Sequence, residues 1–127
     1  MTFGQVGAEF PHLAAELSRL SGPSLDDAVH RIVDTALTTT GLEVPSRDKA
    51  DVERLAWSLD DTAWKLQEDA EQGRTTQVAY HRAFLKARAA SSLLELLEGR
   101  YGPAVYEATH ALSSNEERVL SLLSAAP

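Results

Sequence analysis

Apolar side chains recur every three or four residues through almost the whole of this sequence. That spacing places them on one face of an α-helix, whereas a half-buried β-strand requires strict alternation of apolar and polar residues. The β-branched residues are scattered and never alternate over a sustained stretch. The sequence therefore predicts an all-α fold.

Glycine, proline and capping residues interrupt this pattern and define where the expected helices begin and end. Glycine ends helices because it adopts left-handed backbone angles easily, and serine, threonine and aspartate cap helix starts. These signals predict helices from Pro11 to Leu20, from a cap at Ser24 to Gly41, from a cap at Ser46 to about Gln72, from Thr76 to Glu98, from Gly102-Pro103 to about Leu112, and after a cap at Ser113 or Ser114.

The two longest predicted helices are joined by a short connection at Gly73. Such a connection favours an antiparallel helical hairpin. The helix from Thr76 to Glu98 is apolar over a wide arc, so we expect it to be the most buried. For residues 1–127 we predict one helical-bundle domain of about four main helices, with a central antiparallel helical hairpin and short terminal helices.

Bulk composition narrows the functional classes. The chain has 127 residues, of which 43% are hydrophobic and 24% charged, so it can bury one core without staples. It has no cysteine, which excludes disulfides and thiolate chemistry. Its net charge is −7 and its Lys and Arg residues form no stripe, so we expect no binding to nucleic acid.

The apolar segments are shorter than a membrane span requires, and the first ten residues lack the basic and apolar regions of a signal peptide. We therefore expect no membrane association and a cytoplasmic location. The content of alanine, leucine and arginine is typical of a GC-rich bacterial genome.

Two tryptophans mark the candidate binding surface. Trp57 and Trp64 lie two turns apart on the longest predicted helix, roughly 130° around from its main apolar stripe. They define a second apolar face, and acidic residues surround it. An aromatic patch with a charged rim is typical of a protein contact surface. The predicted partner-binding residues are Trp57, Trp64, Glu53, Asp60 and Glu68, with Glu71 nearby.

Two interpretations of the tryptophan face remain open. In one, the first or last helix of the same chain packs over both rings and the residues belong to the core. In the other, the face binds a protein partner or a second copy of the chain, giving a homodimer. A specific version of the second is a small acidic inhibitor or immunity-type protein that covers a basic patch on its target.

The competing functional class is a metal-binding or enzymatic bundle. Asp27-x-x-His30 and Glu107-x-x-His110 have the carboxylate–histidine spacing of di-iron bundles. However, Glu107 and His110 are expected to point away from the apolar stripe of their helix, and ligands of that type must point inward. No glycine-flanked nucleophile and no glycine-rich phosphate loop is present. We therefore expect no catalysis, no metal and no cofactor.

Overall fold

The computed structural model describes residues 4–123, and within them the chain forms seven α-helices and no strand. The helices are α1 (Gln5–Glu9), α2 (Pro11–Leu17), α3 (Gly22–Thr40), α4 (Lys49–Glu71), α5 (Gln77–Leu97), α6 (Tyr101–Ala111) and α7 (Glu116–Leu123). The predicted all-α domain is thus confirmed. Four helices, α3 to α6, are the longest, and α1, α2 and α7 are short.

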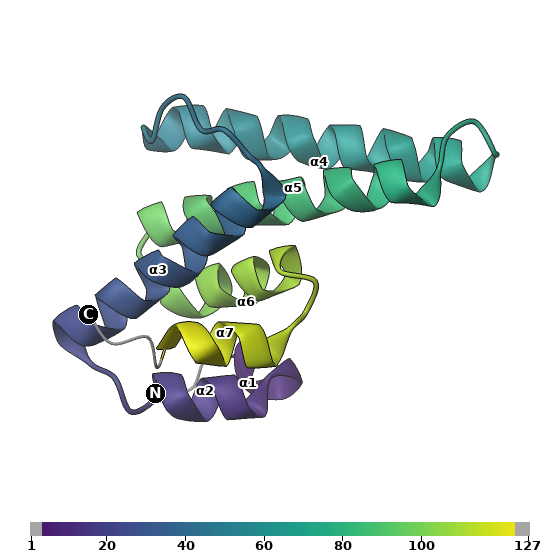
Figure 1. The fold of residues 1–127 in the computed structure, drawn as a ribbon. Coiled ribbons are helices and arrows are strands. Elements are labelled where there is room, and N and C mark those ends of the chain that lie inside the picture. The colour runs from purple at the N-terminus through teal and green to yellow at the C-terminus, as the bar shows by residue number, and fades with distance from the viewer. Residues whose placement is uncertain (1–3, 124–127) are drawn as a thin grey trace.

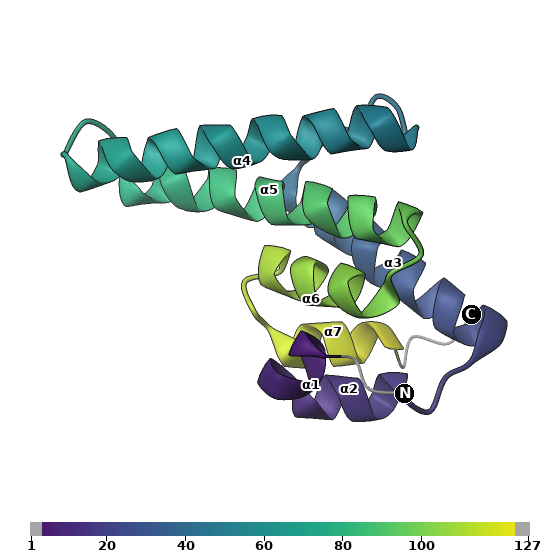
Figure 2. The same cartoon turned by 180° about the vertical axis from the view of Figure 1, so that it is seen from behind.

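The predicted hairpin is formed by α4 and α5, which lie side by side in both views (Figures 1 and 2). Gly73 has a φ of 75°, the left-handed conformation that ends a helix. Its neighbour Arg74 donates its backbone N–H to the Asp69 carbonyl over 2.8 Å, and Thr76 then caps α5 by accepting from the Ala79 N–H. The sequence signals at this turn therefore act as expected.

Several predicted helix starts are wrong by one to three residues. α3 begins at Gly22 after an N-cap at Ser21, because Pro23 is tolerated in the first turn. α4 is capped by Asp48, whose carboxylate accepts from the Ala50 N–H, and not by Ser46. Ser113 and Ser114 both have positive φ and turn the chain, so it is Asn115 that caps α7. At α4 and α7 a second capping side chain near the predicted one takes the role, whereas Ser21 makes no capping hydrogen bond with its side chain.

The N-terminal region also differs from the prediction. The helix that begins at Pro11 ends at Leu17 instead of Leu20. A separate short helix, α1, precedes it and buries Val6 completely. The sequence analysis did not predict α1, since five residues are too few to show a helical period.

One hydrophobic core takes buried side chains from all seven helices, most of them from α3, α5 and α6. Of the two hairpin helices α5 is the central one, because it packs on α3, α4 and α6. At the opposite end of the molecule α7 packs on α2 and α3, and α1 packs on α2 and α6 (Figures 1 and 2). The largest completely buried aliphatic side chains are Leu13, Leu17, Ile32, Leu93, Val6, Val29, Val33, Val52, Val105 and Val119.

The free half of the hairpin extends past this core (Figures 1 and 2). The buried residues of α5 are all at position 87 or later, and the last buried residue of α4 is Ala63. The turn end of the hairpin therefore forms an arm that has little core of its own. None of the helices in residues 4–123 is both long and apolar enough to cross a membrane.

Candidate interaction surface

Helix α4 is the outer helix of the hairpin, and one of its flanks is exposed. Val52, Ala56 and Ala63 are buried on the side that faces α5. Trp57 and Trp64 lie about a third of a turn around from that side at 100° per residue. Among the described residues, α5 is the helix on which α4 packs extensively. The outer flank of α4 is therefore left to solvent.

Both tryptophan rings are on this open flank. Trp57 is 68% exposed and Trp64 is 63% exposed. The first and last predicted helices correspond to α2 and α7, which pack on each other and on α1 and α3 at the other end of the molecule. The interpretation in which a terminal helix covers both rings is therefore wrong.

A groove of about 330 Å³ runs between α4 and α5 beside Trp64. Trp64 forms one wall, and Tyr80 and Phe84 of α5 form the other, with their ring centroids 6.2 Å apart. Ala63 leaves space at the floor because its side chain is small. The remaining lining residues are Asp60, Gln67 and Arg88. The exposed tryptophan is thus part of a hollow aromatic surface.

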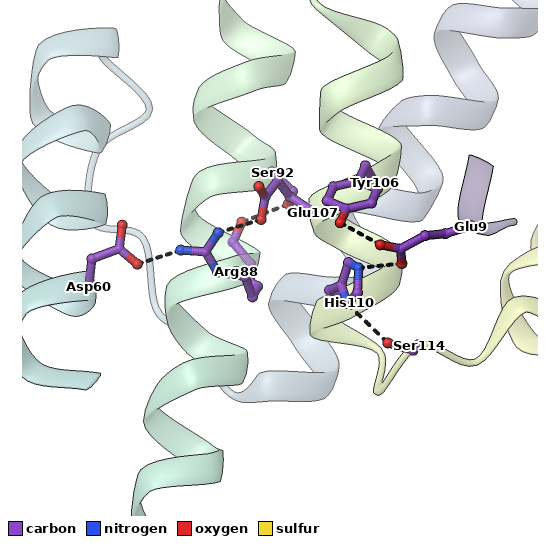
Figure 3. A network of polar contacts seen from close by, with 9 residues as sticks. Glu9, Asp60, Arg88, Ser92, Tyr106, Glu107, His110 and Ser114 are labelled. Carbon is purple, nitrogen blue, oxygen red and sulfur yellow. Dashed lines mark hydrogen bonds and ion pairs between the residues drawn. The ribbon is translucent and has the colours of Figure 1, made fainter. Parts of the chain in front are cut away.

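An ion-pair strut lines one end of this groove and links three helices (Figure 3). Arg88 on α5 donates to Asp60 on α4 and, over 2.7 Å, to Glu107 on α6. Its guanidinium also lies 5.7 Å from the centroid of the Phe84 ring, at cation–π distance. Asp60 was predicted to belong to the acidic rim of the binding surface, and in the structure it is held in this strut.

The environment of the strut shifts the acid–base properties of its members. Burial raises the pKa of the Glu107 carboxyl, and the charge of Arg88 offsets this only in part. Burial also disfavours the charged form of Arg88, but Glu107 and Asp60 more than compensate, so the pKa of Arg88 is raised. Arg88 therefore stays charged, and the Glu107 carboxyl keeps its proton to a higher pH than an ordinary glutamate.

A second polar cluster continues from α6 to α1 (Figure 3). Tyr106 donates to one oxygen of Glu9 over 2.8 Å, and His110 Nε2 lies 3.0 Å from the other. Ser114 Oγ is 3.0 Å from His110 Nδ1. The hydrogen bond to Glu9, with desolvation, raises the pKa of Tyr106. This cluster fastens α1 to the body and lies beyond the aromatic groove.

Three acids on the open flank of α4 have no partner. Glu53, Glu68 and Glu71 form no ion pair or hydrogen bond with another side chain of residues 4–123. They lie on the same side of α4 as the tryptophans. Glu53 comes one turn before Trp57, and Glu68 and Glu71 come one and two turns after Trp64. The aromatic surface therefore has an uncompensated negative rim.

The carboxylate–histidine pairs do not form a centre. Asp27 and His30 lie on α3, Glu107 and His110 lie on α6, and within residues 4–123 no group of three or more His, Asp or Glu side chains is arranged to hold a metal ion. Glu107 and His110 lie off the buried stripe of α6, as expected, but they are not free surface residues, since their side chains are only 20% and 24% exposed. Arg88 covers the first, and α1, which was not predicted, covers the second.

The comparisons with known proteins give no match. No family model fits the chain, and no curated protein or solved structure is significantly similar to it. Any functional proposal therefore depends on the surface itself.

The α5 side of the groove was not predicted from the sequence. Tyr80, Phe84 and Arg88 follow one another at intervals of four residues, which places them along one edge of a helix. That spacing was visible in the sequence. It was obscured because α5 is apolar over so wide an arc that no single edge stands out.

Proposed function

We propose that this chain is a noncatalytic protein–protein interaction domain that binds its partner through the aromatic flank of the α4–α5 hairpin. The observation that carries the proposal is the exposure of Trp57 and Trp64, at 68% and 63%, two turns apart on one regular helix. Elsewhere the described chain buries its large apolar side chains wholly or in part, with Val78 and Leu97 as the other exposed ones.

Burial of the two tryptophan rings would supply much of the binding free energy. A tryptophan side chain offers roughly 150–250 Å² of contact area, most of which is in water here, and tryptophan is enriched among interface residues whose truncation costs about 2 kcal/mol or more. Exposed rings also make little contribution to the stability of the free domain. Their value therefore lies in a complex, where burial of both rings is favourable.

The residues around the two rings favour a specific interface over nonspecific hydrophobic binding. Arginine and aromatic residues are enriched at protein interfaces, and the strut holds Arg88 beside Phe84 and the Trp64 groove. The strut fixes α4 to α5 at one end of the groove, which reduces the ordering that binding requires there. A small acidic inhibitor or immunity-type protein that covers a basic patch is one form this function can take.

Site-specific photocrosslinking in the source cells tests the proposal. A photoreactive amino acid replaces Trp64 in one variant and Ser58 in a matched control, since Ser58 is exposed on another flank of the same helix. We expect one discrete crosslinked product from position 64 and none from position 58. Its mass separates a second copy of the chain from a different protein.

The double variant Trp57→Ala, Trp64→Ala completes the test. Because both rings are exposed, we expect the variant to keep its helical circular dichroism and to lose the crosslink placed at Tyr80 in the groove. A folded double variant that crosslinks from Tyr80 as efficiently as the parent, or equal products from positions 64 and 58, overturns the proposed surface.

A further inference from the structure

The groove beside Trp64 lies where a further helix could pack against α4 and α5. It lies between two antiparallel helices and runs along them, which is where a third helix packs in a three-helix bundle. Its walls are aromatic and its floor residue is Ala63, so a helix axis can approach closely. With neighbouring turns of α4 exposed on the same flank, the site extends in both directions from the groove.

The acids set the length of the occupant. Glu53 and Glu71 are 18 residues apart in the sequence, which corresponds to about 27 Å along a helix at 1.5 Å per residue. The tryptophans lie between them. A partner helix of about 18 residues would therefore span the whole aromatic face and reach an acid at each end.

The charge of the rim selects the occupant. Glu53, Glu68 and Glu71 are unpaired within the described chain, and the whole chain has a net charge of −7. A second copy docked by two-fold symmetry would place this flank against itself and bring like charges together. A helix with lysine or arginine beside its apolar stripe would instead pair with the acids. Its cations would also find the faces of Trp57 and Trp64, because Arg88 already occupies that of Phe84.

We infer that the partner segment is a basic amphipathic helix of a different protein, lying along the α4–α5 groove as a third helix. Its apolar residues cover Trp57, Trp64 and Phe84, and its lysine or arginine residues face Glu53, Glu68 and Glu71. This inference rests on the proposed function and adds to it the secondary structure and the charge of the partner.

The test is a selection from a peptide library in which the charge of the peptides is not fixed beforehand. A displayed library of helical peptides has leucine at heptad core positions and random residues at the flanking ones. It is selected against the full chain and then counter-selected against the Trp57→Ala, Trp64→Ala variant. We expect peptides that need the tryptophans to be enriched in lysine and arginine at the flanking positions.

Charge reversal supplies the second readout on a selected basic peptide. The triple variant Glu53→Lys, Glu68→Lys, Glu71→Lys is expected to weaken its binding by about tenfold or more, from three surface pairs lost and three repulsions gained. A matched triple has the same change in net charge at exposed acids elsewhere, and we expect a much smaller loss. Its substitutions are Asp27→Lys, Glu43→Lys and Glu117→Lys.

Each outcome decides between the two proposals. If tryptophan-dependent peptides are neutral or acidic, or if no peptide is enriched, the basic helix is wrong. A wild-type dimer that the tryptophan variant dissociates would make a second copy the occupant, which overturns the inference and leaves the proposed surface in place. If the enriched peptides bind the tryptophan variant as well as wild type, both the inference and the proposed surface are wrong.

Discussion

At the scale of single residues, the molecule separates two kinds of polar contact. Most ion pairs, such as Lys65–Asp61 and Arg74–Asp69, are local and exposed, and such pairs contribute little. Arg88 is different because it joins three helices and its side chain is only 22% exposed. The orientation of α4 relative to the body depends on this one side chain more than on any surface pair.

The Arg88→Ala variant should therefore be destabilised. It leaves the half-buried Glu107 carboxylate without its cation, and we expect a loss of about 2–3 kcal/mol in the free energy of unfolding. Arg82→Ala, an exposed arginine on the same helix, should change it by less than about 0.5 kcal/mol. Urea unfolding followed by circular dichroism measures both. Equal midpoints for the two variants would show that the strut does not hold the hairpin.

Glu107 should give the protein a pH dependence of known sign. Its pKa is raised in the folded chain from the ordinary value of 4.5, so over the interval between the two values the folded state binds more protons than the unfolded state. The contribution of Glu107 to the free energy of unfolding is fully present below its ordinary pKa. It is lost as pH rises through the pKa of Glu107 in the folded state. From this one group, the free energy of unfolding changes by at most about 1.4 kcal/mol per pH unit.

The Glu107→Gln variant should lack this contribution. We expect the free energy of unfolding of wild type minus that of the variant to fall as pH rises from 4.5 toward neutrality. Chemical unfolding at a series of pH values measures the difference, and Glu117→Gln on α7 controls for the loss of one carboxylate. A difference that rises with pH would mean that the Arg88 charge outweighs burial.

At the scale of elements, the sequence predicts helices well where local signals agree. Gly41 and Gly73 end α3 and α4 because both adopt positive φ at the last turn. Helix starts were less predictable, because several capping residues lie close together and tertiary contacts choose among them. Glu116, for example, accepts the Leu13 N–H over 3.1 Å and ties α7 to α2, a contact that no local pattern indicates.

The same limit explains what could be predicted of the candidate site. Trp57 and Trp64 stood out because a helical period shows which side chains miss the apolar stripe. The groove needs α5 at a particular rotation, and the strut needs α6 as well, so Arg88 and Asp60 became partners only in three dimensions. Periodicity describes one helix at a time and gives no register between helices.

At the scale of the whole molecule, stability is distributed unevenly. The completely buried residues lie in the body, where every helix contributes at least one, with most of them in α3, α6 and the second half of α5. The turn end of the hairpin, from Trp64 to Lys86, includes no buried residue on either helix. Local opening costs least where few apolar contacts are broken. The surface that we propose for binding is therefore built largely on the least stable part of the fold.

Hydrogen exchange of the free protein should show this gradient. We expect amides of residues 65–71 and 79–86 to exchange through local opening well before those of α3 and residues 89–96, which open only with global unfolding. A helix bound along the groove would add apolar contacts to the weak half and slow its exchange selectively. Uniform protection in the free protein would contradict the gradient. If that protection weakened on dilution, a second copy would be covering the arm, since only an association responds to protein concentration.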